Sequence, residues 1–450
     1  MKRPLVVIAC ALVVASTVAD AAAVEPIATV GAPAQATLQA ESMFTPVDVV
    51  SIYQRSNALS PDVGARAISA IENVRGAWAL GRGASVGMAR VSRNGATIQQ
   101  APDGFAYPMS TTALPPEAVG ALMGRNVSGI LAQGQVVMGA TTANLRGAKA
   151  GDVVDVVAAN GSVVSFTIGM VAPDAVVGGT ELLMSTAEAD HIGVTVDGRI
   201  VLWGFSSRAA LDQAISGVGL DGRADTRVRR SWDPSDPDST LGMAATKALL
   251  GEFAFRVNPG GMDITITGDW VAAHLPPDRE VLDPGIRIRA RCNLAVRGDL
   301  QAALTEVNGA GLAGAIDVVN ANTYGGCFYP RFNRVSGSLG FISRHAWAQA
   351  LDTNTVSNAQ GRVPQMNCDV VRILRKHNFA WGGNFLTPDG MHFEWVGQRR
   401  DLLQYPSTYC PNLPVAPGAN GAPAQRPTAG NGLPPSRATL FADDGWANGE

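Results

Sequence analysis

Alternating apolar and polar positions in the first half of the chain predict short strands joined by turns. The run "GDVVDVVAANGSVVSFTIGMV" holds two Val-rich alternating stretches around Asn160-Gly161, a favoured hairpin turn. The run "HIGVTVDGRIVLWG" predicts another strand. The helical pattern "SSRAALDQAISGVG" follows it, with Ser206 or Ser207 as the N-cap. We therefore expect residues 24–227 to form a β-rich mixed domain.

The second half of the chain, residues 243–410, mixes helical and strand-like patterns. "GMAATKALLGEFAFRV" and "RGDLQAALTEVNGAG" are helical, and Gly309 ends the second of these. "NCDVVRILRKHNF" is a helix with Asn367 as its cap, and "GMDITITGDW" and "GIRIRARC" alternate like strands. No βαβ rhythm is present. This predicts an α+β fold with an antiparallel sheet and flanking helices.

The stretch "TPDGMHFEWVG" reads as a buried strand that carries two polar residues. Successive side chains of a strand alternate faces, so Met391, Phe393 and Trp395 share one side and His392 and Glu394 the other. The apolar side is suited to the core. His392 and Glu394 on the polar side must have interaction partners if the strand is buried, because burying an unpaired charged group is costly.

Composition changes mark the remaining boundaries. Residues 228–242, "VRRSWDPSDPDSTLG", combine charge, Pro and Ser without apolar periodicity, which predicts a domain linker. Residues 411–450 are rich in Pro, Gly and Ala with few large apolar side chains, which predicts a disordered tail or a spacer that spans the cell wall. At the N-terminus, Lys2-Arg3, an apolar run and "ADAAA" predict a signal peptide over residues 1–23, with a retained membrane anchor as the alternative.

Charge and cysteine content narrow the class of protein. The chain has 450 residues, 35 basic and 38 acidic, with a net charge of -3. It therefore lacks the excess of basic residues that is typical of nucleic-acid-binding proteins. We expect a secreted, extracytoplasmic protein with no membrane span after removal of the signal; the oligomeric state is left open. Removal of the signal leaves Cys292, Cys327, Cys368 and Cys410, which predicts two disulfides with three possible pairings.

The histidines suggest a metal site. His345, Asp352 and His392 supply two imidazoles and a carboxylate, the nitrogen and oxygen ligands that zinc takes with a fourth position left for water. Asp389 stands three residues before His392 in a Pro-Asp-Gly turn, where a carboxylate can act as general base. The same turn chemistry also has a purely structural explanation.

These residues carry a family resemblance. "GGCFYPRFNRVSGSLGFISRHAWAQALDTN" and "FAWGGNFLTPDGMHFEW" resemble the zinc D-alanyl-D-alanine carboxypeptidases of the VanY type, peptidase family M15. The family pattern is Ser-x-His-x-x-Gly-x-Ala-x-Asp, then Trp-Gly-Gly, then Asp-x-x-His or Glu-x-x-His. Matching positions are Ser343, His345, Ala350 and Asp352, then Trp381, Gly382 and Gly383, then Asp389 and His392. Ala348 departs from the pattern, since the family has glycine there.

The resemblance implies a zinc peptidase domain acting on peptidoglycan stem peptides through a zinc-activated water. It makes His345, Asp352 and His392 the zinc ligands and Asp389 the general base. Arg331 takes the place of the arginine that stabilises the developing oxyanion, with Arg334 as the alternative. A carboxypeptidase cutting terminal D-Ala-D-Ala and an endopeptidase cutting an internal link both fit. The rival interpretation is a zinc-stabilised, non-catalytic cell-wall-binding or signalling module.

Overall fold

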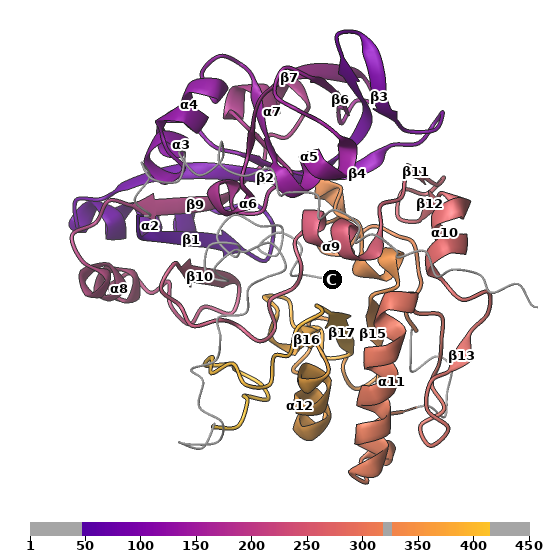
Figure 1. Cartoon of the computed structure of the whole chain (residues 1–450). Helices are drawn as coiled ribbons and strands as arrows, with labels where there is room; N and C mark the ends of the chain where they lie inside the picture. The colour runs from indigo at the N-terminus through magenta and orange to yellow at the C-terminus, as the bar shows by residue number, and fades with distance from the viewer. Residues whose placement is uncertain (1–46, 318–325, 415–450) are drawn as a thin grey trace, which may run out of the picture. The chain divides into compact units, whose positions relative to one another are not determined.

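The computed structural model of the chain describes residues 47–317 and 326–414. The predicted signal peptide, residues 24–46 and residues 415–450 of the predicted tail lie outside the described residues. All described residues belong to one compact unit. They mix helices and strands without regular alternation, so the predicted mixed α+β class is confirmed (Figure 1).

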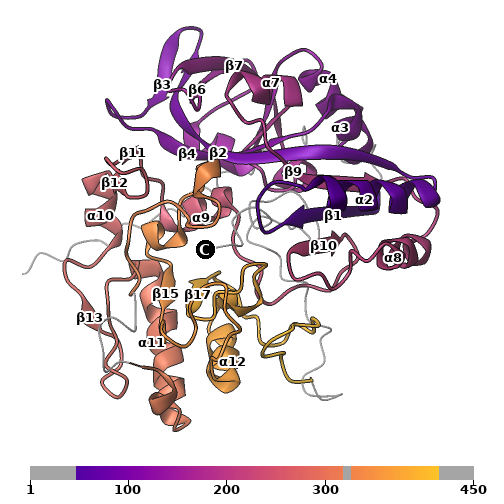
Figure 2. The same cartoon turned by 180° about the vertical axis from the view of Figure 1, so that it is seen from behind.

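The N-terminal part of the described chain, which runs from β1 to β10, is built on one large mixed sheet. Its order is β10-β1-β9-β2-β4-β8-β5-β7-β6, and β3 pairs with β2. Because β2 pairs with both β4 and β6, the second half of the order closes into a barrel-like ring. Figure 2 shows β2 as one long strand that reaches from β9 to β4. The strands are β1 (Val49–Gln54), β2 (Ala77–Arg93), β3 (Ala96–Gln100), β4 (Tyr107–Ala113), β5 (Val136–Gly139), β6 (Val153–Val157), β7 (Val163–Ala172), β8 (Leu182–Met184), β9 (Asp197–Trp203) and β10 (Thr226–Arg230).

Short helices cover this sheet and its ring. The predicted hairpin is confirmed, because β6 and β7 pair antiparallel across the Asn160-Gly161 turn. The predicted helix after β9 is also confirmed, with Ser207 as its N-cap. The helices are α2 (Pro61–Asn73), α3 (Pro116–Leu122), α4 (Arg125–Leu131), α5 (Ala140–Arg146), α6 (Asp174–Val177), α7 (Thr186–His191) and α8 (Arg208–Gly217).

The C-terminal part runs from α9 to the end of the described residues. Its two longest helices, α11 and α12, pack against a small antiparallel sheet of order β15-β17-β16. The predicted helix at 242–257 is wrong in its second half, because α9 ends at Leu250 and residues 255–257 form β11. The elements are α9 (Met243–Leu250), β11 (Phe255–Val257), β12 (Ile264–Ile266), α10 (Gly268–His274), β13 (Glu280–Val281), β14 (Arg289–Ala290), α11 (Leu294–Gly309), η1 (Ala313–Ala315), η2 (Gly337–Leu339), η3 (Arg344–Trp347), β15 (Ala350–Asp352), α12 (Cys368–Lys376), β16 (Phe379–Trp381), η4 (Gly382–Asn384) and β17 (His392–Trp395).

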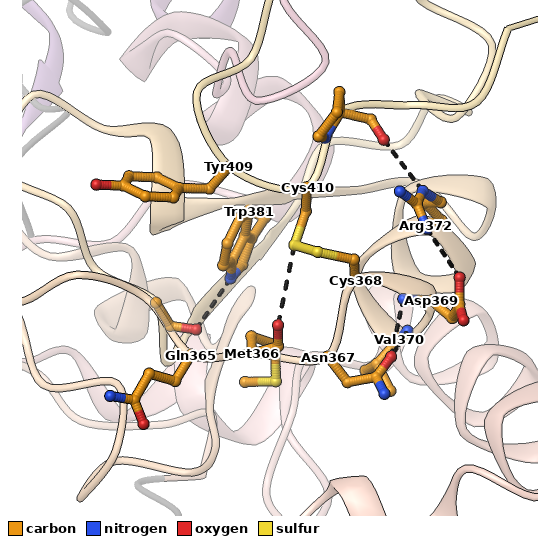
Figure 3. The surroundings of a disulfide bond; sticks show 12 residues. Gln365, Met366, Asn367, Cys368, Asp369, Val370, Arg372, Trp381, Tyr409 and Cys410 are labelled. Carbon is orange, nitrogen blue, oxygen red and sulfur yellow. Dashed lines mark hydrogen bonds and ion pairs between the residues drawn. A yellow bond between two sulfur atoms is a disulfide. The ribbon is translucent and has the colours of Figure 1, made fainter.

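Two disulfides tie the C-terminal part together. They pair Cys292 with Cys327 and Cys368 with Cys410, which selects one of the three predicted pairings. Figure 3 shows the second bond at the start of α12, beside the Asn367 side chain that caps this helix. The first residues of the predicted tail also make contacts, since the Arg372 guanidinium donates to the Pro411 carbonyl oxygen. The helices of the described residues include none long and apolar enough to cross a membrane.

A buried ion cluster joins the two parts. Lys247 on α9 lies 2.8 Å from Glu181, which precedes β8, and both side chains are fully buried. Lys247 also lies 3.0 Å from Glu252, which pairs with Arg146 on α5 at 2.6 Å. Two cations therefore face two carboxylates in a site that is almost completely buried. Such a cluster stabilises the fold only while its charges balance, because an unpaired buried charge is costly.

The predicted linker, residues 228–242, packs between the two parts. Residues 228–230 belong to β10, which pairs with β1. Asp236 and Asp238 are buried, and Asp238 accepts two hydrogen bonds from the Arg375 guanidinium on α12. The segment therefore contributes buried charges to the structure, while the domain boundaries at 227 and 242 stay a prediction.

We predict that Lys247→Met lowers the free energy of unfolding by about 3–5 kcal/mol, because it leaves two buried carboxylates facing one cation. The double variant Lys247→Met/Glu181→Gln restores the balance between Arg146 and Glu252 and should recover part of this loss. Urea unfolding monitored by tryptophan fluorescence measures both values. A single variant that costs under about 1 kcal/mol would contradict the role of this cluster.

Candidate metal centre

His345 is placed by a capped turn. The Ser343 hydroxyl accepts a hydrogen bond from the His345 backbone N–H and begins η3, which explains a serine two residues before the histidine. The turn ends at Ala348, whose φ of 53° lies in the left-handed region that favours glycine. Glycine, which the pattern has at this position, would adopt this φ without the steric cost that alanine carries. After the turn the chain enters β15 and reaches Asp352.

Asp352 and His392 are placed opposite each other by the small sheet. In the antiparallel pairing of β15 with β17, the register partners are Ala350 with Glu394, Leu351 with Phe393 and Asp352 with His392. Directly opposite residues on one face of an antiparallel pair have their side chains close together. The two residues are therefore neighbours, although 40 positions separate them in sequence.

The three side chains converge. His345 Nε2 lies 3.2 Å from Asp352 Oδ1, and His392 Nδ1 lies 3.1 Å from the same oxygen. One ligand atom from each residue lies within 4.8 Å of the others. Ligands about 2.0–2.1 Å from a tetrahedral ion stand about 3.3 Å apart, so these spacings match a zinc site.

The hydrogen bond that His345 makes through Nδ1 leaves its Nε2 available to bind a metal. Its Nδ1 lies 3.1 Å from the Cys327 carbonyl oxygen, an acceptor, so the neutral ring carries its proton on Nδ1. Nε2 is then unprotonated; it is buried and forms no hydrogen bond of its own. A backbone carbonyl that fixes the tautomer in this way is typical of metal-binding histidines. These residues therefore fit a zinc ion.

Asp352 is an ionised group in this setting. Burial alone would raise the pKa of its carboxyl, but the imidazoles of His345 and His392, whenever they carry a proton towards Asp352, outweigh burial and hold this pKa far below its ordinary value. The side chain stays 18% exposed, whereas His345 and His392 are almost completely buried. The carboxylate thus lies at the open edge of the group.

Asp389 lies in the turn before β17 and is buried. Its backbone N–H donates to the Gly382 carbonyl oxygen at 2.8 Å, and its Oδ2 accepts from Gln360 Nε2 at 3.2 Å. A Cβ atom at Gly382 would stand 2.6 Å from the Asp389 carbonyl oxygen and 3.1 Å from the His392 Cβ. The first glycine of Trp-Gly-Gly therefore lets the Asp389 turn lie against β16 and brings Asp389 beside His392.

Glu394 shares the polar side of β17 with His392, as the alternation predicted. Its Oε2 lies 3.6 Å from His392 Nε2, and its Oε1 accepts from Gln349 Nε2 at 2.9 Å. The Arg344 guanidinium lies 3.4 Å from Oε1. Glu394 is thus held in place by Gln349 and Arg344, close to the His392 imidazole.

Arg331 and Arg334 differ in their surroundings. The Arg331 guanidinium is buried, donates through one terminal nitrogen to the Phe332 carbonyl oxygen at 3.1 Å, and leaves Nε without a hydrogen bond. Arg334 is exposed. Of the two arginines, only Arg331 has a donor group that is shielded from water. Trp347 and Trp381 are fully buried and serve packing.

The sequence did not reveal the residues that hold the loop between β16 and Asp389. Asp238 Oδ2 accepts from Asn384 Nδ2, and Asp238 Oδ1 accepts from the Trp381 backbone N–H. Arg227 on β10 donates to the Asn384 carbonyl oxygen at 2.7 Å, and Arg55, just after β1, donates to the Leu386 carbonyl oxygen at 2.9 Å. The loop is therefore positioned by residues from the N-terminal part and from the predicted linker, where composition gave no signal.

Two imidazoles and a carboxylate around one open position are the ligand set of catalytic zinc sites in hydrolases. Residues 336–395 match a family model described as D-alanyl-D-alanine carboxypeptidase. The predicted resemblance to the M15 peptidases is thereby confirmed for this segment, which contains Ser343, His345, Asp352, Asp389 and His392 and ends before the tail. Arg331 precedes the matched residues. No curated protein sequence matches this chain.

We predict that Gly382→Ala lowers the temperature of unfolding, and any peptidase activity of the chain about a hundredfold, because the added methyl pushes the Asp389 turn away from β16. Kinetic assay and thermal unfolding of the purified chain measure the effect. Gly298→Ala is the matched control: Gly298 lies in α11, its added Cβ meets no atom within 4 Å, and alanine favours the helix. Full activity of Gly382→Ala would contradict the close approach described above.

Proposed function

We propose that the chain is a secreted zinc metallopeptidase that hydrolyses peptidoglycan stem peptides, as a D-Ala-D-Ala carboxypeptidase does. The observation that carries this proposal is the convergence of His345, Asp352 and His392, which stand with the buried Asp389 in the order of the M15 pattern. The family match supports a hydrolase, and the stem-peptide substrate follows from its description. Zinc, when bound, would supply a Lewis acid that polarises a carbonyl group and lowers the pKa of water.

His345, Asp352 and His392 would hold the ion, and each of the two imidazoles has a polar neighbour. The Cys327 carbonyl group fixes His345, and Glu394 lies close to the His392 imidazole. Such outer contacts raise the basicity of an imidazole and fix its tautomer. This arrangement supports a preformed ligand set.

Asp389 would act as general base and then as general acid. Its carboxylate takes a proton from the attacking water and returns it to the leaving amine. The hydrogen bond from Gln360 fixes the rotation of the carboxyl group, so that it faces a constant direction during both transfers. Two proton transfers through one oriented group need no large movement of the chain.

Arg331 would stabilise negative charge on the carbonyl oxygen of the substrate. A buried guanidinium stabilises a nearby negative charge more strongly than an exposed one does, because water does not screen its charge. The exposed Arg334 lacks this advantage. A zinc-stabilised module without activity would need neither group, and the presence of both Asp389 and Arg331 favours the enzyme.

Secretion is part of the same proposal. The signal-like residues 1–23 would direct export, and the two disulfides of the structure are typical of oxidising compartments outside the cytosol. Peptidoglycan lies in such a compartment. The location and the substrate therefore agree.

We predict that Asp389→Asn keeps one zinc per chain and lowers hydrolysis of stem peptides by 10²–10⁴-fold, because the amide cannot accept the proton. Metal analysis and mass spectrometry of products from purified wall fragments measure the two effects. Asp369→Asn is the control: this aspartate lies in the first turn of α12 and is largely exposed, so both measurements should match the wild type. Full activity of Asp389→Asn would sink the assignment of the base.

A further inference from the structure

A cavity of about 510 Å³ is lined in part by the loop between β16 and Asp389. One part of the lining is Arg55 with residues 220–224 and 226–228 from the N-terminal part. The other part is residues 361–363, 383–386 and Pro388, together with Tyr405, Thr408 and Tyr409. In the sequence, Pro388 directly precedes Asp389, and Gly383 directly follows Gly382. None of the candidate metal ligands lines this cavity, so it is separate from the metal centre. Its volume is that of a small-ligand site.

The cavity is strongly cationic. Four arginines line it, against one carboxylate from Asp221. Asp221 pairs with Arg230, and Arg223 pairs with Asp225, so these charges are compensated. The remaining arginines, at positions 55, 227 and 362, form no ion pair with a carboxylate in the described part of the chain. A hollow lined by one sign of charge concentrates counter-charged ligands.

Two of these guanidinium groups are held in fixed positions. Arg55 donates to the carbonyl oxygens of Leu386 and Ala224, at 2.9 and 2.7 Å. Arg227 donates to the Asn384 carbonyl oxygen at 2.7 Å. Carbonyl groups satisfy donors without neutralising the charge. The positive charge is therefore preorganised, which lowers the entropic cost of binding an anion.

The cavity is connected to the candidate base by one short segment. Gln360 donates to the Asp389 carboxylate, Gly361 donates through its backbone N–H to the Pro388 carbonyl oxygen at 2.6 Å, and Arg362 lines the cavity. Arg362 is exposed, so its guanidinium is open to a ligand in solution. A ligand bound by Arg362 would therefore contact the segment that orients Asp389.

We propose that this cavity is a subsite for a carboxylate of the peptide substrate at a distance from the bond that is cut. The inference rests on the proposed function and makes it more specific: the enzyme would prefer peptides with free side-chain carboxylates to the same peptides with amidated carboxylates. Arginine pairs with a carboxylate through two parallel hydrogen bonds, which an amide cannot reproduce. The N-terminal part thereby supplies half of a substrate-binding site.

The test compares two synthetic stem peptides that differ only in free or amidated carboxylates. We expect the full-length wild type to favour the free-carboxylate peptide by about tenfold in kcat/KM, the value of one charge-assisted hydrogen bond at a partly exposed site. In Arg362→Gln this ratio should fall towards one, while the temperature of unfolding is unchanged. Arg279→Gln, an exposed arginine outside the cavity, should keep the wild-type ratio.

The possible outcomes separate the two proposals. If the wild type cleaves both peptides equally well, the subsite is refuted and the peptidase assignment stands. If the preference persists in Arg362→Gln, Arg362 does not bind the carboxylate, and the proposed link between the ligand and the Gln360–Arg362 segment is wrong. If the zinc-loaded wild type cleaves neither peptide, the proposed function itself fails, and the subsite fails with it.

Discussion

The antiparallel pairing of β15 with β17 is the constraint on which the candidate metal centre depends. Its register sets Asp352 against His392 as direct partners, and the capped turn before β15 brings His345 to the same carboxylate oxygen. A shift of one residue in this register would turn His392 and Glu394 to the opposite face. The ligand set therefore exists only because these three-to-four-residue strands pair correctly.

Several unrelated contacts keep this small sheet in register. Gly382 allows the Asp389 turn to approach β16, Glu394 anchors the polar side of β17, and Asp238 connects the loop after β16 to α12. Arg55 and Arg227 add hydrogen bonds from the N-terminal part. The N-terminal part is thus joined to the candidate centre through both the loop near Asp389 and the buried Lys247 cluster, which explains why all described residues belong to one compact unit.

The sequence predicted the local features and missed the long-range ones. The Asn160-Gly161 hairpin, the Asn367 cap and the sides of β17 follow from periodicity and turn chemistry, which depend on neighbouring residues. The importance of Asp238 was hidden, because a buried aspartate in a Pro- and Ser-rich segment has the composition of a linker. The pairing of the cysteines, the ring closure through β2 and the register of β15 all join distant segments, so no local pattern encodes them. The ligand residues were found through a spaced motif, and their proximity required the fold.

The most direct measurement is X-ray absorption at the zinc edge on the purified full-length chain, combined with metal analysis. We expect one zinc per chain with two imidazole nitrogens and one carboxylate in its coordination shell, and loss of bound zinc in His345→Ala and in His392→Ala. A chain that binds no zinc, or that keeps one zinc per chain with the same coordination shell in both variants, would contradict the account.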